Sequence, residues 1–547
     1  MRILTNFLIV ICLTIVFPSS VFSQKEVAGA NIITSSDLES YVSFLASPLL
    51  KGRLNGGEGL EIAAKYLATE IKLIGLLPAN GNSYFQPYSI DEKLIDPEKT
   101  MVKVITGEKD TVKLTQPLYQ LFPTGPSDFI IDGDVVFAGY GIKTDKYNYN
   151  DFEGITTEGK ILLVMNRAPT SEDGKKFIFE ETPWASFLSI QVKLSTLLFS
   201  RAKAILFVMD PKSGFSSLNE QYPDISQELN SSKSLHGEKP RVMDFPGMPK
   251  IIFIHRVVAD ELLKGTGHSL EELQKSIDSD VKPHSFSLTG KKISITEVSM
   301  IKEKVLNNVA GFIEGRDPVL KNEIVIFSGH YDHIGEQGGV VNTGADDDAS
   351  GCAALLSMAK AFRSLDQKPL RSILFLWVSG EEIGLYGSKS YVENPLFPLN
   401  NTVADLNMDM IGRVKSIADS TGETPMSGPE TVFVITDNQS KELRSIADDA
   451  DRKSILNFDY SLSGKDHPLQ LFQRSDHFNF VKNDIPVLFF TTGLHADYHT
   501  PGDVIEKIDF KKMELITKTM YEIGLTVANK KKRLDVDNPY SSWGKSK

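Results

Sequence analysis

The chain is poor in cysteine and has no excess of positive charge. Only Cys12 and Cys352 occur among its 547 residues, and its formal net charge is -12. This acidity argues against a nucleic acid or an anionic membrane as partner. Beyond the N-terminal segment, no run is long and apolar enough to span a membrane, so we expect no membrane association once that segment is removed. No Gly-x-Ser-x-Gly elbow of the serine hydrolases stands out either.

Residues 1–23 are typical of a secretory signal peptide. Arg2 supplies the positive start, residues 7–17 form the apolar centre, and residues 21–23 offer a small-residue cleavage site. The apolar run is short for a membrane span of about 20 residues. We therefore expect a cleaved chain that is secreted or periplasmic. Cys352 is then the single cysteine, which excludes an internal disulfide, and its Ala/Leu-rich surroundings predict a core residue rather than a nucleophile.

The length of the chain predicts two or more domains. Residues 24–100 read as an N-terminal helical part of the larger domain, with a loop at 78–87. Residues 101–300 contain short β-rich runs and a polar loop near 214–241, so we expect an inserted α+β domain there. Residues 301–530 alternate strands and helices, which is typical of a largely parallel α/β sheet. Residues 531–547 are predicted to be a solvated, poorly ordered tail.

Candidate ligands follow the predicted strands at their carboxyl ends. The strand at 373–378 is followed by Glu381 and Glu382, a pair that is costly to bury unless a metal or a proton lies between the carboxylates. The strand at 324–327 leads to His330, and Asp332 is placed to hold the other ring nitrogen of this histidine. Further candidates follow in three short runs: Asp346, Asp347 and Asp348 before a helix, Asp409 after a strand, and Tyr498 and His499 near the last strand.

These residues share one position in the predicted fold. Ligands of open α/β sheets bind outside the carboxyl ends of the strands, so the recurrence favours one metal site. Taken singly, the same residues also fit a core histidine, a helix cap or a buried carboxylate. Three consecutive aspartates exceed what one helix cap requires, and we expect their surplus charge to need a cation.

The types of the candidate donor groups indicate which metal is expected. Two imidazoles and at least three carboxylates suit Zn²⁺ first, with Co²⁺ or Mn²⁺ as alternatives. The ligands are too many for one tetrahedral ion and sufficient for two Zn²⁺ that share a carboxylate. Three carboxylates and a bridging hydroxide would balance the two ions and leave Glu381 free. Such a pair, about 3.5–4 Å apart, polarises a carbonyl group and provides hydroxide at neutral pH.

Five motifs carry a resemblance to a known family. They are His330-Tyr-Asp, Gly344-Ala-Asp-Asp-Asp-Ala-Ser-Gly351, Gly380-Glu-Glu-Ile-Gly384, Asn407-Met-Asp-Met-Ile-Gly-Arg413 and Tyr498-His-Thr-Pro-Gly-Asp503. Together they resemble the co-catalytic zinc peptidases of clan MH, family M28, which includes bacterial leucyl-type aminopeptidases and glutamate carboxypeptidases. The resemblance covers residues 307–529 and, more weakly, residues 36–74. Residues 135–211 look like the protease-associated (PA) domain that is often inserted in such enzymes.

The resemblance implies a fold and a role for each site residue. The implied fold is an α/β/α sandwich around a mostly parallel mixed sheet, with an inserted α+β PA-like domain. One metal would be bound by His330 and Asp409, the other by Glu382 and His499, and Asp347 would bridge them. Two further residues would act in catalysis without binding metal. Glu381 would be the general base that moves a proton from the bridging water to the leaving amine, and Tyr498 would steady the oxyanion.

The leading hypothesis is a secreted di-zinc exopeptidase, most simply an aminopeptidase acting on peptides. Alternatives on the same scaffold are a glutaminyl cyclase with one zinc, and a carboxypeptidase or amidohydrolase. Arg413 is the only basic residue obviously close to a motif, and a carboxypeptidase would need a basic cluster. A non-catalytic binding protein, as in transferrin receptors, is a further alternative, but such proteins lack the ligands that are present here. The pair Asp476 and His477 lies near the site and is as well explained by a structural hydrogen bond.

Overall fold

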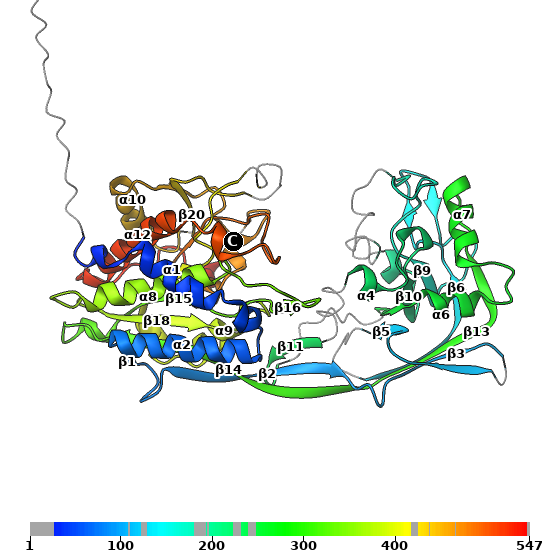
Figure 1. Cartoon of the computed structure of the whole chain (residues 1–547), viewed down its shortest axis with the longest axis horizontal. Coiled ribbons are helices and arrows are strands. Elements are labelled where there is room, and N and C mark those ends of the chain that lie inside the picture. Colours follow the sequence, from blue (N-terminus) through cyan, green and yellow to red (C-terminus); the bar gives the residue numbers. More distant parts are fainter. Residues whose placement is uncertain are drawn as a thin grey trace, which may run out of the picture.

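The computed structural model describes residues 27–543, apart from 108–109, 122–127, 180–192, 194–195, 223–230, 239–247, 417–418, 420–424, 437 and 465. The predicted signal peptide lies outside the described residues. Two bodies lie side by side and are connected along one edge by long strands (Figure 1). Each body contains its own large β-sheet.

The larger sheet has a parallel centre. Its strands run in the order β11-β2-β14-β18-β15-β19-β22-β20-β21, with β1 beside β14. The four central strands are β18 (Ser372–Val378), β15 (Ile324–His330), β19 (Thr402–Met408) and β22 (Val487–Thr491), and they pair in parallel. Every residue of these four strands is buried, which accounts for their continuous apolar sequences.

Antiparallel strands extend this sheet on both sides. They include β2 (Phe85–Ile95), β11 (Ser231–Leu235), β14 (Ser299–Ile313) and β20 (Thr431–Ile435), while β21 (Asn457–Asp459) pairs in parallel with β20. The short strand β1 (Leu77–Pro78) pairs with β14. The expected mixed α/β fold is therefore confirmed, and parallel pairing is concentrated at its centre.

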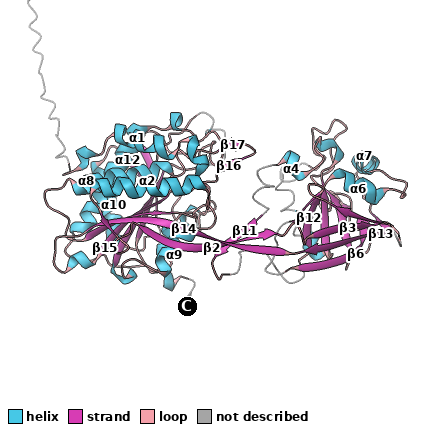
Figure 2. Ribbon diagram, turned by 60° about the horizontal axis from the view of Figure 1, so that its bottom comes forward, coloured by secondary structure: helices cyan, strands magenta, loops and turns pink. Residues whose placement is uncertain are grey.

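Helices cover both faces of the larger sheet (Figure 2). One face packs against α1 (Ser35–Leu45), α2 (Glu58–Ile74), α8 (Ala349–Arg363), α10 (Lys441–Lys453) and α12 (Phe510–Asn529). The other face packs against α9 (Tyr386–Glu393) and α11 (His477–Val481). Cys352, on α8, is fully buried, as predicted for a core residue. Within the described part of the chain, no helix combines the length and the apolar character needed to cross a membrane.

The second body is built on an eight-stranded sheet with the order β4-β3-β13-β6-β9-β10-β12-β5. Its strands are β3 (Met101–Ile105), β4 (Thr111–Leu114), β5 (Tyr119–Leu121), β6 (Phe129–Phe137), β9 (Ile161–Met165), β10 (Ala204–Val208), β12 (Lys250–Ile254) and β13 (Phe286–Glu297). The helices α6 (Arg256–Leu263) and α7 (Leu270–Asp280) contribute apolar side chains to its core. All eight strands lie within the region expected to be inserted.

A two-stranded ribbon joins the two bodies. Strand β2 pairs with β14 along its whole length, from Phe85 opposite Val309 to Ile95 opposite Ser299. The N-terminal part at 24–100, expected to consist of helices and a loop, thus also contains the strand β2, which belongs to the larger sheet. The polar loop near 214–241 also contains a strand, β11, which returns from the second body and pairs with β2. The exact domain boundaries stay a prediction.

The C-terminal segment contacts the larger body as far as residue 543, although most of its residues are exposed, as expected of a solvated tail. Leu534 is buried. The Trp543 ring contacts the rings of Phe472 and Tyr540. The main-chain amide of Lys441 donates to Asp537 over 2.8 Å.

Candidate metal centre

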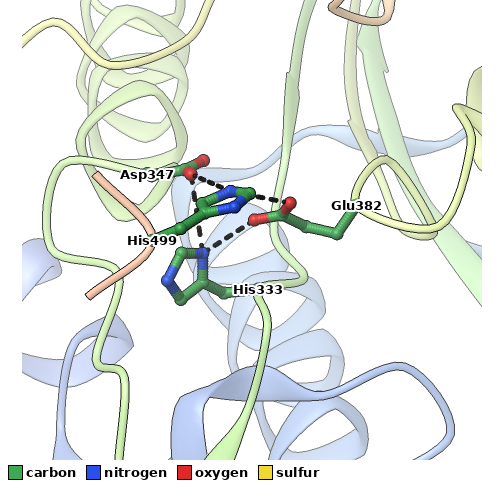
Figure 3. Close-up of side chains that lie close together, drawn as sticks. All are labelled: His333, Asp347, Glu382 and His499. Atoms are coloured by element: carbon green, nitrogen blue, oxygen red, sulfur yellow. Dashed lines mark hydrogen bonds and ion pairs between the residues drawn. The ribbon is translucent and has the colours of Figure 1, made fainter. Parts of the chain in front are cut away.

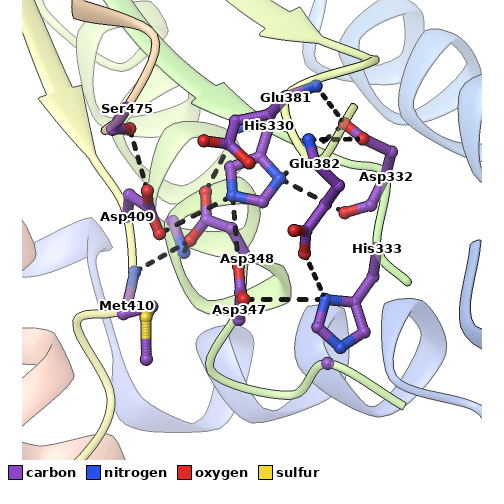
Figure 4. Close-up of polar contacts among 12 residues, drawn as sticks. His330, Asp332, His333, Asp347, Asp348, Glu381, Glu382, Asp409, Met410 and Ser475 are labelled. Carbon is purple, nitrogen blue, oxygen red and sulfur yellow. Dashed lines mark hydrogen bonds and ion pairs between the residues drawn. The ribbon is translucent and has the colours of Figure 1, made fainter. Parts of the chain in front are cut away.

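All five predicted ligands meet at the carboxyl ends of the central strands. His330 ends β15, Glu382 follows β18, Asp409 follows β19, His499 lies beyond β22, and Asp347 precedes α8. Their donor atoms fall into two groups that share Asp347: His330 with Asp347 and Asp409, and His333 with Asp347, Glu382 and His499. Within each group the donor atoms lie within 4.8 Å of one another. Figure 3 shows the second group and Figure 4 the surrounding contacts.

The first group is arranged around Nε2 of His330. This atom lies 3.2 Å from Oδ1 of Asp347 and 3.6 Å from Oδ1 of Asp409. The hydroxyl of Ser475 donates to the second carboxylate oxygen of Asp409 over 2.8 Å and fixes its orientation (Figure 4). On the far side of the ring, Nδ1 of His330 lies 3.2 Å from the main-chain carbonyl of Asp332. A proton on Nδ1 leaves the lone pair of Nε2 facing the carboxylates.

The second group contains a residue that sequence reasoning missed. Nε2 of His499 lies 3.1 Å from Oδ2 of Asp347 and 3.0 Å from Oε2 of Glu382. Nδ1 of His333 lies 2.8 Å from the other oxygen of Glu382, Oε1 (Figure 3). The signal was available, because His333 closes the same Ser328-Gly-His-Tyr-Asp-His333 run that supplied His330. Asp347 thus directs one oxygen to each group.

Two donor atoms of the cluster make no hydrogen bond. They are the buried Nε2 atoms of His330 and His499, whereas His333 takes part through Nδ1, which pairs with Glu382. Buried polar atoms are almost always hydrogen-bonded, so each exception calls for an explanation. Here the Nε2 atoms of His330 and His499 lie 3.0–3.6 Å from carboxylate oxygens without making a hydrogen bond, and only His333 pairs with a carboxylate, that of Glu382. Imidazole nitrogen and carboxylate oxygen are zinc ligands, so the donor set fits zinc.

The electrostatics favour a cation at this position. Burial lowers the pKa of His330, but the carboxylates of Glu381 and Asp409 outweigh it and raise this pKa well above its usual value. Burial likewise lowers the pKa of His499, and Asp347 and Glu382 raise it to about 10. Burial raises the pKa of Asp347, whereas His330 and His499 bring it well below its usual range. The buried carboxylates therefore attract positive charge.

The three consecutive aspartates have three different environments. Only Asp347 faces the cluster. Asp346 accepts from the amide of Gly412 over 2.6 Å. Asp348 caps α8 by accepting from the amide of Gly351 over 2.8 Å, and it also accepts from the amides of His330 and Met410. The expectation that these carboxylates need a cation therefore applies only to Asp347, because main-chain amides donate hydrogen bonds to the carboxylates of Asp346 and Asp348.

A tight turn brings Glu381 and Glu382 to the same side of the sheet. Gly380 begins it with a φ of +72°, and a Cβ at this position would lie 2.6 Å from the hydroxyl of Tyr88. The carboxylate of Asp332 then accepts from the amides of Glu381 and Glu382, each over 3.2 Å. Asp332 therefore contacts the other ring nitrogen of His330, as expected, but through its main-chain carbonyl rather than its carboxylate. Its Oδ1 lies 3.7 Å from Nδ1 of His330, and its carboxylate is occupied by the turn.

Glu381 and Tyr498 line a cavity beside the two groups. Glu381 belongs to neither donor group. Burial, and then the neighbouring Glu382, raise the pKa of Glu381 well above its usual value, against the opposing effect of His330. The Tyr498 ring stacks on the His499 ring with centroids 3.8 Å apart. The guanidinium of Arg474 donates to the Tyr498 hydroxyl over 3.4 Å.

His477 has a structural environment. Its Nε2 donates to the carbonyl of Phe472 over 2.9 Å, and burial lowers its pKa to about 3. The structural hydrogen bond considered for this residue is therefore present. The neighbouring Asp476 differs, because both of its buried carboxylate oxygens make no hydrogen bond. Burial raises the pKa of Asp476 to about 7.

The chain resembles known aminopeptidases. Leucine aminopeptidase 1 of Trichophyton equinum is 28% identical over 252 residues, which cover 44% of this chain and 62% of that protein. Aminopeptidase YwaD of Bacillus subtilis is 27% identical over 248 residues, covering 43% of this chain and 49% of that protein. The chain thus spans less than two thirds of either relative. The solved aminopeptidase from Aneurinibacillus sp. strain AM-1 has the same fold, with a TM-score of 0.50, 17% identity and coverage of 93% and 97%.

Fold and site together define an α/β protein with a cluster of histidines and carboxylates, suited to hold metal ions, at the carboxyl edge of its central sheet. Residues 308–524 match the model of peptidase family M28. This match to peptidase family M28 confirms the resemblance inferred from the five motifs.

Proposed function

We propose that this protein is a di-zinc exopeptidase that removes N-terminal residues from peptides. One observation carries the proposal: two groups of histidine and carboxylate donors share Asp347, and the free carboxylate of Glu381 stands beside them. His330, Asp347 and Asp409 would hold one ion, and Asp347, Glu382 and His499 the other. The carboxylate of Glu382 also lies within hydrogen-bond distance of His333, which would fix its orientation.

Zinc, when bound, polarises the scissile carbonyl and makes hydroxide available at neutral pH. Glu381 is the general base in this proposal. Its carboxylate lines the same cavity as Asp347 and Asp409, from which it can accept a proton from water and deliver it to the leaving amine. Tyr498 lies at the cavity as well, and its hydroxyl would donate to the developing oxyanion.

The lining of the cavity supports cleavage at the amino end of a peptide. The carboxylates of Asp347, Glu381 and Asp409 lie at one part of the wall and would attract a free α-amine. Apolar residues form much of the remaining wall: Met410, Leu471, Phe489 and Leu494. This combination suits a substrate with a free N-terminal amine and an apolar first side chain.

A carboxypeptidase is the second candidate, and Arg474 favours it. This exposed side chain lines the cavity and would pair with a terminal carboxylate. Arg413, the basic residue noted in the sequence, is already engaged. It pairs with Asp497 over 2.5 Å and lies 3.6 Å from Asp503.

Three peptides distinguish the candidates: Leu-Phe-Ala, its N-acetylated form and its C-terminal amide. An aminopeptidase releases leucine from the first and the third and leaves the acetylated peptide intact. Cleavage of the acetylated peptide together with failure on the amide would instead indicate a carboxypeptidase. A chelator should abolish turnover, and zinc should restore it, with about two ions per chain by elemental analysis. One zinc per chain, or cyclisation of an N-terminal glutamine, would favour the glutaminyl cyclase alternative.

We also propose that residues 1–23 direct export and that the second body is a PA-like domain. The charged start, apolar centre and small-residue end of the N-terminal segment support export. Expression of the full chain in a bacterial host, followed by fractionation, tests this. A chain outside the cytoplasm that begins at Gln24 is expected, and an uncleaved cytoplasmic chain would contradict the proposal.

A further inference from the structure

We propose that Arg53 and Asn55, on the turn before α2, are positioning residues of the metal centre. This inference rests on the proposed zinc site. Both residues lie more than 250 positions before the family M28 match, which begins at residue 308. The match therefore contains the ligands, and a separate N-terminal segment holds them in place.

Arg53 is fully buried and uses every donor of its guanidinium. Nε donates to the carbonyl of Tyr331 over 2.8 Å. Nη1 donates to the carbonyls of Leu45 and Thr343, the latter over 2.8 Å, and Nη2 donates to those of Gly344 and Asp347 over 3.0 and 3.3 Å. Four of these five carbonyls belong to the two loops that carry His330, His333 and Asp347. One side chain therefore fixes both loops relative to each other.

The backbone of the turn is also joined to these loops. The amide of His333 donates to the carbonyl of Arg53 over 3.1 Å, and the amide of Gly335 donates to that of Gly52 over 3.0 Å. Gly52 has a φ of +64°, and a Cβ there would lie 2.3 Å from the carbonyl oxygen of Asn342. Only glycine fits this approach without displacing the loop. The turn is thus in direct backbone contact with the loops of the proposed site.

Asn55 supports the turn that carries Glu381 and Glu382. This buried side chain donates from Nδ2 to Oδ2 of Asp332 over 2.7 Å. The same carboxylate accepts from the amides of Glu381 and Glu382, which bear the proposed base and a proposed ligand. Asn55 therefore orients Asp332, and Asp332 holds the turn. Arg53 and Asn55 together reach both donor groups.

The residue type at position 53 is specific. A guanidinium offers five donors in a planar fork, whereas a lysine ammonium offers three donors at a point. Arg53→Lys keeps the charge and leaves at least two of the five buried carbonyls unpaired. Supporting contacts around metal ligands typically contribute about 10–100-fold to metal affinity. A loss in this range is therefore expected for the lysine variant.

Zinc affinity of the full-length protein tests the proposal without reference to turnover. Wild type, Arg53→Lys, Asn55→Ala and the control Arg371→Lys are stripped with chelator and titrated with zinc against a chromophoric competitor. Arg371 is a matched control because it is also fully buried, and it binds Glu323 and the carbonyls of Val527 and Lys530 at the start of β18. Arg53→Lys should bind zinc about 10–100-fold more weakly and Asn55→Ala about 10-fold more weakly. Arg371→Lys should keep the wild-type affinity.

Circular dichroism and urea midpoints show which variants are folded. Wild-type zinc affinity in folded Arg53→Lys and Asn55→Ala would overturn the proposal, and so would an equal loss in Arg371→Lys, which would indicate general destabilisation. If Arg53→Lys does not fold, Asn55→Ala decides: a weaker affinity supports the proposal and an unchanged one overturns it. Failure of the wild type to bind zinc would instead refute the proposed function and this inference with it.

Discussion

The two bodies of the molecule differ in how their buried carboxylates are hydrogen-bonded. In both, acidic side chains follow parallel strands at their carboxyl ends. In the second body, Asp210 follows β10 and accepts two hydrogen bonds from Arg167, over 2.6 and 2.7 Å, and one from Gln274. At the candidate metal centre, Asp347 instead lies between His330 and His499, whose Nε2 atoms make no hydrogen bond.

Whether the buried charged groups already have hydrogen-bond partners distinguishes a structural cluster from a candidate ligand-binding site. A buried ion pair with ideal geometry satisfies its own charges and leaves nothing to bind. A group of donors that converge without pairing remains costly until a cation joins it. Position at a strand end is therefore insufficient to identify a site, and the decisive feature is whether the donors already have partners.

The largest expected effect comes from neutralising the proposed base. Glu381→Gln should lower kcat by about 10²–10⁴-fold because the amide cannot accept the proton from water. Zinc content should stay at the wild-type level, since Glu381 belongs to neither donor group. Turnover of a Leu-peptide substrate and elemental analysis of the purified variant measure the two quantities. Full activity in this variant would refute the assignment of the base.

The paired cluster of the second body should show a loss of stability without a loss of zinc. Asp210→Asn leaves the buried guanidinium of Arg167 without its counter-charge, and breaking such a pair costs about 3–5 kcal/mol. Urea unfolding followed by circular dichroism measures this free energy. The control is Asp134→Asn, whose partly exposed pair with Lys160 contributes at most about 1 kcal/mol. Loss of zinc from folded Asp210→Asn would contradict the distinction between the two clusters.

The smallest expected effect concerns a buried histidine without carboxylate partners. Burial lowers the pKa of His477 to about 3 in the folded protein, against about 6.5 when unfolded. Between these values the unfolded chain binds a proton that the folded chain does not, so stability falls as the pH drops below 6.5. This residue should contribute a loss of about 2 kcal/mol between pH 6.5 and pH 5.

His477→Gln removes that contribution. The unfolding free energies of the variant and the wild type, measured in urea at pH 7, 6 and 5, should therefore converge towards lower pH. Curves that stay parallel over this range would show that His477 does not titrate as its buried position requires.

The sequence predicted the elements of the larger domain well because their patterns are local. The apolar runs at 324–327 and 373–378 became β15 and β18, and Asp509 caps α12 as the start of the last helix. It failed where pairing is distant. The strands β2 and β11 lie far apart in the chain and pair with each other, and β2 also pairs with the distant β14, so their place in the larger sheet depends on tertiary contacts.

In the candidate site, too, some features follow from local sequence and others only from the tertiary structure. Residue types and their positions after strands were sufficient to predict that the candidate histidines and carboxylates are neighbours, because parallel strands end at one edge of a sheet. The choice of Asp347 and Glu382 among adjacent carboxylates came from the resemblance to a known family. The tertiary structure decided the rest. It added His333, and it showed that Asp332 contacts the ring of His330 through its main-chain carbonyl while its carboxylate holds the turn at Glu381 and Glu382. It also brought Arg53 under the site from an N-terminal segment, since hydrogen bonds between distant segments depend on packing that no local pattern encodes.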